Sequence, residues 1–141
     1  MEQKKFKKIL IIFSDFYAEV SKNLIDGAEN YLNQNNISFE KKKVDGSLEI
    51  PFLLHKFKNE FDGFIVLGCV IKGETDHYEI VKDICLKEVY SFAYKECIPL
   101  GCGILTVNNL EQAIERSDVR KKNLGEVAAK ACCNLINIIK D

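Results

Sequence analysis

Apolar residues occur along the chain in short continuous runs, and helical spacing follows the first of them. After the run ILIIF at 9–13, apolar residues recur at Val20, Leu24 and Ala28, the interval at which they share one face of a helix. The run FIVLGCVI at 64–71 has almost no polar position, as expected for a strand buried on both faces. The pattern therefore predicts strands that alternate with helices.

Two further strands extend this pattern. Residues 37–44 alternate and are rich in lysine, which favours a strand near an edge of the sheet, whereas IPLGCGILT at 98–106 is largely apolar. A short helix is expected from about residue 50 to 58, a second helix from about Tyr78, and further helices near the C-terminus. The helix from Tyr78 should face inward at Val81, Ile84, Cys85, Val89 and Phe92. Asn108, with Glu111 three residues later, is expected to cap the next helix.

Such an alternation indicates parallel βαβ units with helices on both sides of the sheet. We expect an α/β fold, a three-layer flavodoxin-like sandwich with a four-stranded parallel sheet flanked by helices. The chain has 141 residues, of which 47% are hydrophobic, enough for one sizeable core. Residues 1–141 are therefore expected to form a single domain.

The charge balance narrows the range of functions. Twenty Lys and Arg side chains balance twenty-one Asp and Glu, so no overall basic field would attract nucleic acid or an anionic membrane. The apolar run at 9–13 is too short for a signal peptide, and no stretch approaches the roughly 18 apolar residues that cross a bilayer. We expect a soluble, cytoplasmic protein that acts on small polar partners.

The cysteines show neither a CxxC pair nor the spacing of a metal site. They fall within apolar segments, which favours small buried thiols over the alternative of a disulfide framework or a metal site. We assign no metal and no redox role to them. They are Cys69, Cys85, Cys97, Cys102, Cys132 and Cys133.

The candidate site follows from the fold, because ligands of such sheets bind beyond the carboxyl ends of the strands. The loops at those ends are 14–19, 45–51, 72–79 and 106–109. In the third, KGETDHYE, Gly73 permits unusual backbone dihedrals, and the following amides open a helix and could hold a phosphate. His77 could move protons beside that anion near neutral pH. Alternatively, Thr75 or Asp76 caps the helix and His77 is a surface residue.

Other side chains near these loops have two interpretations each. Phe16 could stack on a flat heterocycle or act as a hydrophobic staple for the next helix. Glu49 could accept hydrogen bonds from ligand hydroxyls or favour a helix N-terminus. Arg116 and Arg120 are the two arginines among twenty basic residues; they could bind phosphate or be exposed charges at a helix end. His55 is interpreted as a surface residue.

Three segments carry a combined resemblance to a known family. VDGSLEIP at 44–51, LGCVIKGETDHYEIV at 67–81 and ILTVNNLEQAIERS at 104–117 resemble the linked motifs of the 6,7-dimethyl-8-ribityllumazine synthase family. They occur in order and at compatible spacing, and the resemblance extends from about Ile9 to the C-terminus. Several linked motifs are far more specific than a lone short pattern.

The resemblance implies a reaction without a metal or organic cofactor. The family condenses 5-amino-6-(D-ribitylamino)uracil with 3,4-dihydroxy-2-butanone 4-phosphate, which gives 6,7-dimethyl-8-ribityllumazine, phosphate and water. It also implies a homo-oligomer, either a pentamer or a sixty-subunit shell, with active sites at subunit interfaces. The stretch SDVRKKNLGE at 117–126 differs from the family's glycine-containing turn, which bears on that choice.

The same resemblance implies roles for individual residues. Phe16 would stack on the pyrimidine, and His77 would be the proton shuttle. The phosphate would be held by Gly73, Glu74, Thr75 and Arg116, the last of these from a neighbouring subunit. The ribityl chain, the ring edge and the pocket wall would be contacted by Ser47, Leu48, Glu49, Cys69, Val70, Ile71 and Cys102.

Five positions depart from the family's usual pattern. Asp45 stands where proline is common and Lys72 where arginine is usual. Cys102 occupies a place often held by a phenylalanine that packs against the neighbour's substrate. Leu124 replaces a frequent lysine, and Val127 replaces an acidic residue near the histidine. The last three bear on affinity and on the tuning of His77.

Three other functions are alternatives to the synthase activity. A riboflavin synthase of the archaeal type shares the fold, but it would leave the phosphate loop and Arg116 without a partner. A lumazine- or flavin-binding carrier would keep the pocket and lose the chemistry. A flavodoxin-like electron carrier is disfavoured, because the loop SDFYAEV at 14–20 lacks the glycine and hydroxyl density of a phosphate cradle.

Overall fold

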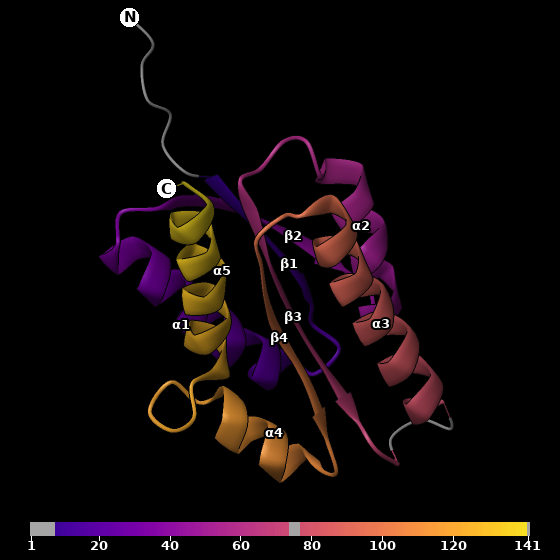
Figure 1. Ribbon diagram of the computed structural model, residues 1–141. Coiled ribbons are helices and arrows are strands. Elements are labelled where there is room, and N and C mark those ends of the chain that lie inside the picture. Colours follow the sequence, from indigo (N-terminus) through magenta and orange to yellow (C-terminus); the bar gives the residue numbers. More distant parts are fainter. Residues whose placement is uncertain (1–7, 74–76, 141) are drawn as a thin grey trace, which may run out of the picture.

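A computed structural model describes residues 8–73 and 77–140 of the chain. Strands and helices alternate along it, as the apolar pattern predicts (Figure 1). The elements are β1 (Lys8–Ser14), α1 (Ala18–Gln34), β2 (Ser38–Val44), the 3-10 turn η1 (Ser47–Glu49), α2 (Ile50–Phe57), β3 (Gly63–Ile71), α3 (Tyr78–Glu96), β4 (Leu100–Val107), α4 (Leu110–Ser117) and α5 (Leu124–Lys140).

The four strands form one sheet in the order β2-β1-β3-β4, and every neighbouring pair is parallel. The lysine-rich β2 lies at an edge, where its charges discourage pairing with another strand. The apolar β3 lies inside the sheet and is buried at every position except Cys69, which is half-buried. The predicted four-stranded parallel sheet is confirmed.

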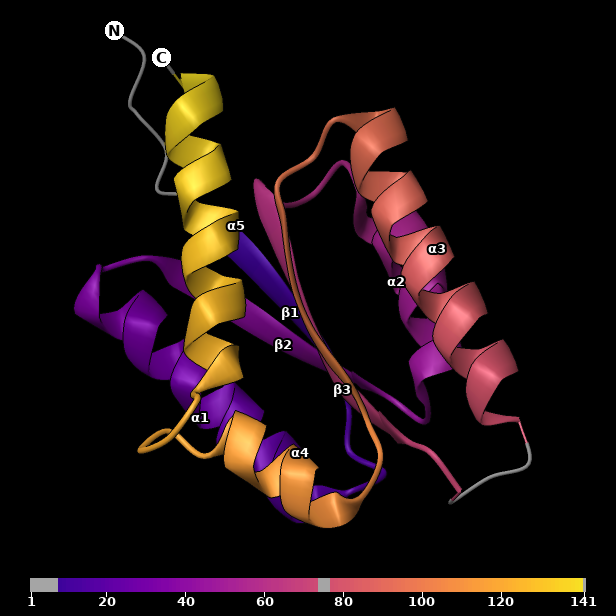
Figure 2. The ribbon, with the colours of Figure 1, turned by 60° about the horizontal axis from the view of Figure 1, so that its bottom comes forward.

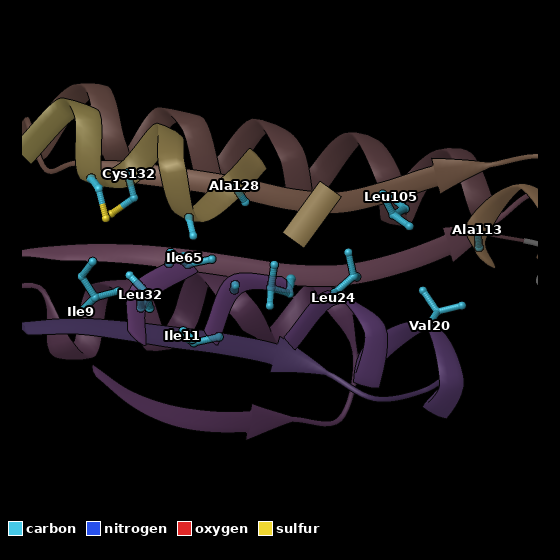
Figure 3. Close-up of a cluster of buried hydrophobic side chains, with 14 of the residues drawn as sticks. Ile9, Ile11, Val20, Leu24, Leu32, Ile65, Leu105, Ala113, Ala128 and Cys132 are labelled. Carbon is cyan, nitrogen blue, oxygen red and sulfur yellow. The ribbon is translucent and has the colours of Figure 1, made fainter. Parts of the chain in front are cut away.

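Helices cover both faces of this sheet, which gives three layers (Figures 1 and 2). On one face α1, α4 and α5 enclose the cluster that Figure 3 shows, in which Ile11 and Ile65 of the sheet lie among Leu24 of α1 and Ala128 of α5. On the other face α2 and α3 enclose a second cluster around Phe64. Alternate residues of each strand serve the two clusters, as the pleat requires. The predicted three-layer α/β sandwich is confirmed.

Helix α5 lies unusually close to its neighbours, and two glycines make this possible. A Cβ at Gly101 of β4 would overlap the backbone oxygen of Ala128, and a Cβ at Gly125 would overlap the backbone oxygen of Leu24. Any side chain at these two positions would push α5 away from β4 or from α1. These close contacts hold α5 against β4 of the sheet and against α1.

Two predictions about side-chain burial are wrong. Ile84 was expected to face inward, yet 48% of it is exposed, because it lies about 100° around α3 from the buried Cys85. Cys97 is exposed rather than buried. It ends α3 in the left-handed conformation, with φ 55°, a position outside the core where glycine is the usual residue.

The predicted cap of α4 is wrong by one residue. The N-cap is Asn109, whose side chain accepts a hydrogen bond from the backbone N–H of Gln112 at 2.8 Å. The Gln112 side chain in turn accepts from the backbone N–H of Asn108 at 2.8 Å. Asn108 therefore contributes its backbone and not its side chain, and Gln112 takes the place expected for Glu111.

This geometry separates two adjacent asparagines experimentally. We expect Asn109→Ala to lower the free energy of unfolding by about 1 kcal/mol, because it leaves a helix N–H without its acceptor. Asn108→Ala keeps the backbone N–H that Gln112 uses, so it should change stability by less than about half of that. Urea unfolding of both variants at one protein concentration measures the difference. An equal loss from both would contradict the cap assignment.

Candidate functional site

The parallel strands all end at the same side of the molecule, at the bottom of Figure 1, where α4 and the start of α3 also lie. The residues after β1 and the last residues of β3 lie at this side, and η1 follows β2 there as well. This is the edge at which ligands of parallel sheets bind. The parallel arrangement of the strands thus places the predicted ligand-binding segments on one side of the protein.

A hollow of about 170 Å³ opens at the carboxyl ends of β1 and β3. It is lined from four places in the chain: the end of β1 with the residues after it, the start of η1, the end of β3 and the first turn of α3. The lining residues are Ser14, Phe16, Tyr17, Gly46, Ser47, Cys69, Val70, Ile71 and Val81. Five of the side chains predicted for the site therefore lie around one space.

Phe16 stands at the mouth of this hollow with 75% of its surface exposed. Its ring meets the ring of Tyr17 edge to face, with centroids 5.0 Å apart. Such exposure means that Phe16 is not a hydrophobic staple packed on α1, although the staple was one of its two interpretations. An exposed ring face beside a hollow is available for stacking on a flat ligand.

The three residues of the turn η1 differ in their exposure to solvent. Ser47 is buried and lines the hollow, whereas Leu48 is 42% exposed and Glu49 is exposed as well. Neither Leu48 nor Glu49 lines the hollow, although both lie next to it in the chain. Pro51 is the second residue of α2, in the first turn, where its missing N–H has no partner to lose.

The end of β3 supplies the wall of the hollow. Val70 and Ile71 are buried, and Cys69 is half-buried between the hollow and the α1 and α5 side of the core. Burial raises the pKa of the Cys69 thiol to about 12. Because the thiolate is the reactive form of cysteine, Cys69 can serve as a wall but not as a nucleophile near neutral pH.

The loop after β3 is described only in part. Gly73 has φ 87°, which confirms that it takes a conformation other residues rarely adopt. Glu74, Thr75 and Asp76 lie outside the described residues. His77 is exposed and directly precedes α3, so it stands beside the helix N-terminus, where the field favours an anion.

Two predicted site residues lie away from the hollow within this chain. Cys102 pairs in register with Val66, four residues before Val70, or roughly 13 Å down the sheet. It packs against the cluster that α2 and α3 enclose on the other face of the sheet. Arg116 is exposed in the last turn of α4. The other arginine, Arg120, follows that helix and donates from its backbone N–H to Asp118 at 2.8 Å.

Four residues that line the hollow were not predicted: Ser14, Tyr17, Gly46 and Val81. Ser14 had a visible signal in the sequence, since it is the polar residue that ends an apolar strand. Val81 had none, because an apolar residue on a helix is ordinarily assigned to the core. Tyr17 and Gly46 neighbour predicted residues, but their neighbours alone do not reveal which way they face.

The described residues contain neither a metal-binding cluster nor a membrane-spanning helix. In the two described stretches of chain, His, Cys, Asp and Glu side chains form no group of three or more that could hold a metal ion. Among the helices at residues 8–73 and 77–140, none has both the length and the apolar content that a membrane span needs.

The sequence is similar to one family along nearly all of its length. The family model for 6,7-dimethyl-8-ribityllumazine synthase matches residues 7–140. The chain is 34% identical to the 6,7-dimethyl-8-ribityllumazine synthase of Paramagnetospirillum magneticum, over 95% of each chain. It is 39% identical to the enzyme of that name from Bartonella bacilliformis, over 94% of this chain and 90% of the relative. For Bartonella tribocorum the identity is 37%, over 99% and 94%.

The raised pKa of Cys69 gives a test that needs no substrate. At pH 8 we expect iodoacetamide to alkylate Cys69 at least a hundredfold more slowly in the folded protein than in urea, because burial and a pKa of about 12 leave almost no thiolate. Mass spectrometry of the digested protein measures the rate at each cysteine. Equal rates for Cys69 in the folded and unfolded protein would contradict its assignment as an inert wall residue.

Proposed function

The chain belongs to the 6,7-dimethyl-8-ribityllumazine synthase family, transferases of riboflavin biosynthesis, and we propose that it carries out the condensation itself. It would join 5-amino-6-(D-ribitylamino)uracil to 3,4-dihydroxy-2-butanone 4-phosphate and release 6,7-dimethyl-8-ribityllumazine, phosphate and water. Residues 1–141 would act as one synthase domain. No metal or organic cofactor takes part in this proposal.

One observation carries the proposal: residues that the family resemblance assigns to the substrate, from three separate parts of the chain, meet at the same hollow. Phe16, Ser47 and Val70 come from different parts of the chain and line one space at the carboxyl ends of the strands. An aromatic face, a hydroxyl and an apolar wall together suit a flat heterocycle with a polar edge. The pyrimidine would stack on Phe16, and the ribityl chain would extend past Ser47 toward Leu48 and Glu49.

The phosphate of the second substrate would lie at the turn that starts at Gly73. The positive φ of that glycine and the nearby N-terminus of α3 support an anion there. Arg116 would complete the phosphate site through its planar guanidinium, which matches two phosphate oxygens. His77, directly before α3, would stand between the phosphate and the reacting carbonyl.

The reaction needs positioning and proton transfers but no covalent enzyme intermediate. The 5-amino group of the uracil attacks the ketone, and loss of water gives an imine. Phosphate then leaves, the enol tautomerises, and the ribityl-bearing nitrogen closes the second ring with loss of water. His77 would move the protons in these steps, while the hollow holds the two reactants in register and so removes much of the entropic barrier.

The size of the hollow supports a site shared between subunits. Its volume of about 170 Å³ falls below the roughly 300 Å³ at which ligand pockets usually begin. The chain also exposes large apolar side chains, with Tyr94 at 77%, Phe52 at 74% and Ile138 at 67%, as subunits of an oligomer do. We propose a homo-oligomer, a pentamer or a sixty-subunit shell, in which Cys102 and Arg116 of one subunit face the hollow of the next.

The experiment that tests the proposed function is direct. Purified protein is mixed with the two substrates, and the fluorescence of the lumazine product is followed against the uncatalysed background. A rise that scales with protein concentration is expected. Folded, oligomeric protein that gives no rise above background would overturn the proposed activity, and product binding without turnover would identify a carrier instead.

The two histidines of the chain give a matched pair of variants. We expect His77→Ala to lower kcat by roughly a hundredfold or more, because one general acid or base typically contributes that much. Activity should stay above background, because substrate positioning remains. His55→Ala removes an exposed side chain on α2 that contacts the ring of Phe92, and kcat should not change. Complete loss of activity in correctly assembled His77→Ala protein would contradict this division of labour.

A shared site predicts complementation between two inactive variants. Phe16→Ala and Arg116→Ala should each lose most activity, since each removes one half of every site. In a random one-to-one mixture reassembled from both, about a quarter of the sites combine an intact Phe16 with an intact neighbouring Arg116. We expect lumazine formation to recover to about that fraction of the unmodified protein. Failure to exceed the sum of the separate variants would place both residues in the same subunit's site.

A further inference from the structure

Ser14 is a residue of the hollow to which neither the sequence motifs nor the family resemblance gives a role. It is the last residue of β1 and is only 4% exposed. The backbone oxygen of Ser14 accepts a hydrogen bond from the hydroxyl of Ser21 at 3.0 Å, which ties the end of the strand to α1. The Ser14 side chain faces the hollow that Phe16 and Ser47 also line.

Of the four buried serines among the described residues, two donate hydrogen bonds from their hydroxyls to backbone oxygens and two line the hollow. In the described part of the chain, the buried polar side chains are Ser14, Ser21, Ser47 and Ser117. The hydroxyl of Ser21 donates to Ser14, and that of Ser117 donates to the backbone oxygen of Ile114 at 3.2 Å. The hydrogen bond from Ser21 uses the backbone oxygen of Ser14 and not its hydroxyl, and both Ser14 and Ser47 line the hollow.

The hydroxyls of Ser14 and Ser47 converge beside Gly68. A Cβ at Gly68 of β3 would lie 3.0 Å from the Oγ of Ser14 and 3.1 Å from the Oγ of Ser47, and the next atom, on Ile50, is 3.8 Å away. The two hydroxyls therefore converge on one point of the wall, and residue 68 has no side chain that shields them. Three segments of the chain build this polar spot in an otherwise apolar wall.

Two serine hydroxyls that converge on the wall of a hollow can hydrogen-bond a ligand held there. Each serine hydroxyl can donate one hydrogen bond and accept two, which suits a heterocycle edge that alternates carbonyl oxygens with N–H groups. A ring stacked on the exposed face of Phe16 would turn such an edge toward the ends of β1 and β3. The uracil ring of the first substrate has this shape and this chemistry.

We propose that Ser14 is a further substrate-binding residue, and that it holds the polar edge of the pyrimidine ring together with Ser47. This inference rests on the proposed function for the identity of the ligand. It assigns Ser14 to the ribitylaminouracil and not to the phosphate-bearing ketone, since the phosphate turn begins at Gly73, beyond the end of β3.

The test is Ser14→Ala in the full, assembled protein. We expect KM for the ribitylaminouracil to rise about five- to tenfold, and KM for the butanone phosphate to stay within about twofold. Binding of 6,7-dimethyl-8-ribityllumazine, measured by fluorescence titration, should weaken by a similar factor. The melting temperature should hold, because the hydrogen bond that ties Ser14 to Ser21 uses the backbone oxygen of Ser14, which the variant keeps.

The matched control is Ser117→Ala, which removes a buried serine hydroxyl that already has a protein partner. It should lower the melting temperature and leave both KM values and product binding unchanged. A purely structural Ser14 would behave like Ser117, with lower stability and unaltered binding, and that result would overturn the proposal. The titration of product decides the question even if the unmodified protein forms no lumazine, a result that by itself would refute only the proposed activity. Equal affinity of Ser14→Ala and unmodified protein for the product, within twofold, would refute the role of Ser14.

Discussion

The inner strands β1 and β3 have neither a free face nor a free edge, and this constraint determines where a ligand can reach them. Helices cover both faces of the sheet, and β2 and β4 occupy its two edges. The ends of the inner strands are what remains. Because all four strands are parallel, the carboxyl ends meet on one side, and the loops that follow them share one space.

Groups that a ligand could contact gather at that side. The exposed ring of Phe16, the left-handed turn at Gly73 and the hydroxyls of Ser14 and Ser47 all lie near the ends of the inner strands. The exposed Phe16 ring leaves apolar surface in water, which a ligand or a neighbouring subunit would cover.

The sequence allowed the fold to be predicted because apolar periodicity reports burial directly. The buried run at 64–71 became the inner strand β3, and the lysine-rich run at 37–44 became an edge. Predictions failed where one residue of register matters: the cap lies at Asn109 rather than Asn108, and Ile84 faces solvent. Neither result contradicts the pattern, since helical spacing fixes a stripe more firmly than its borders.

The candidate site was predictable in part for a similar reason. Residues that the resemblance assigned to the substrate, such as Phe16, Ser47 and Val70, line one hollow, whereas Cys102 lies well away from it in the same chain. Ser14 was missed because a serine that ends a strand has no distinctive spacing. Whether its hydroxyl finds a partner depends on Gly68 and Ser47, which are brought to it only by folding.

The proposed function requires that the hollow at the ends of β1 and β3 hold the pyrimidine of the substrate. A crystal structure of the assembled protein with 6,7-dimethyl-8-ribityllumazine bound tests this most directly. We expect the ring system stacked on Phe16, its polar edge within hydrogen-bond distance of Ser14 and Ser47, and Arg116 of a neighbouring subunit near His77. A ligand bound elsewhere, such as in the apolar groove beside Tyr90 and Tyr94, would contradict it.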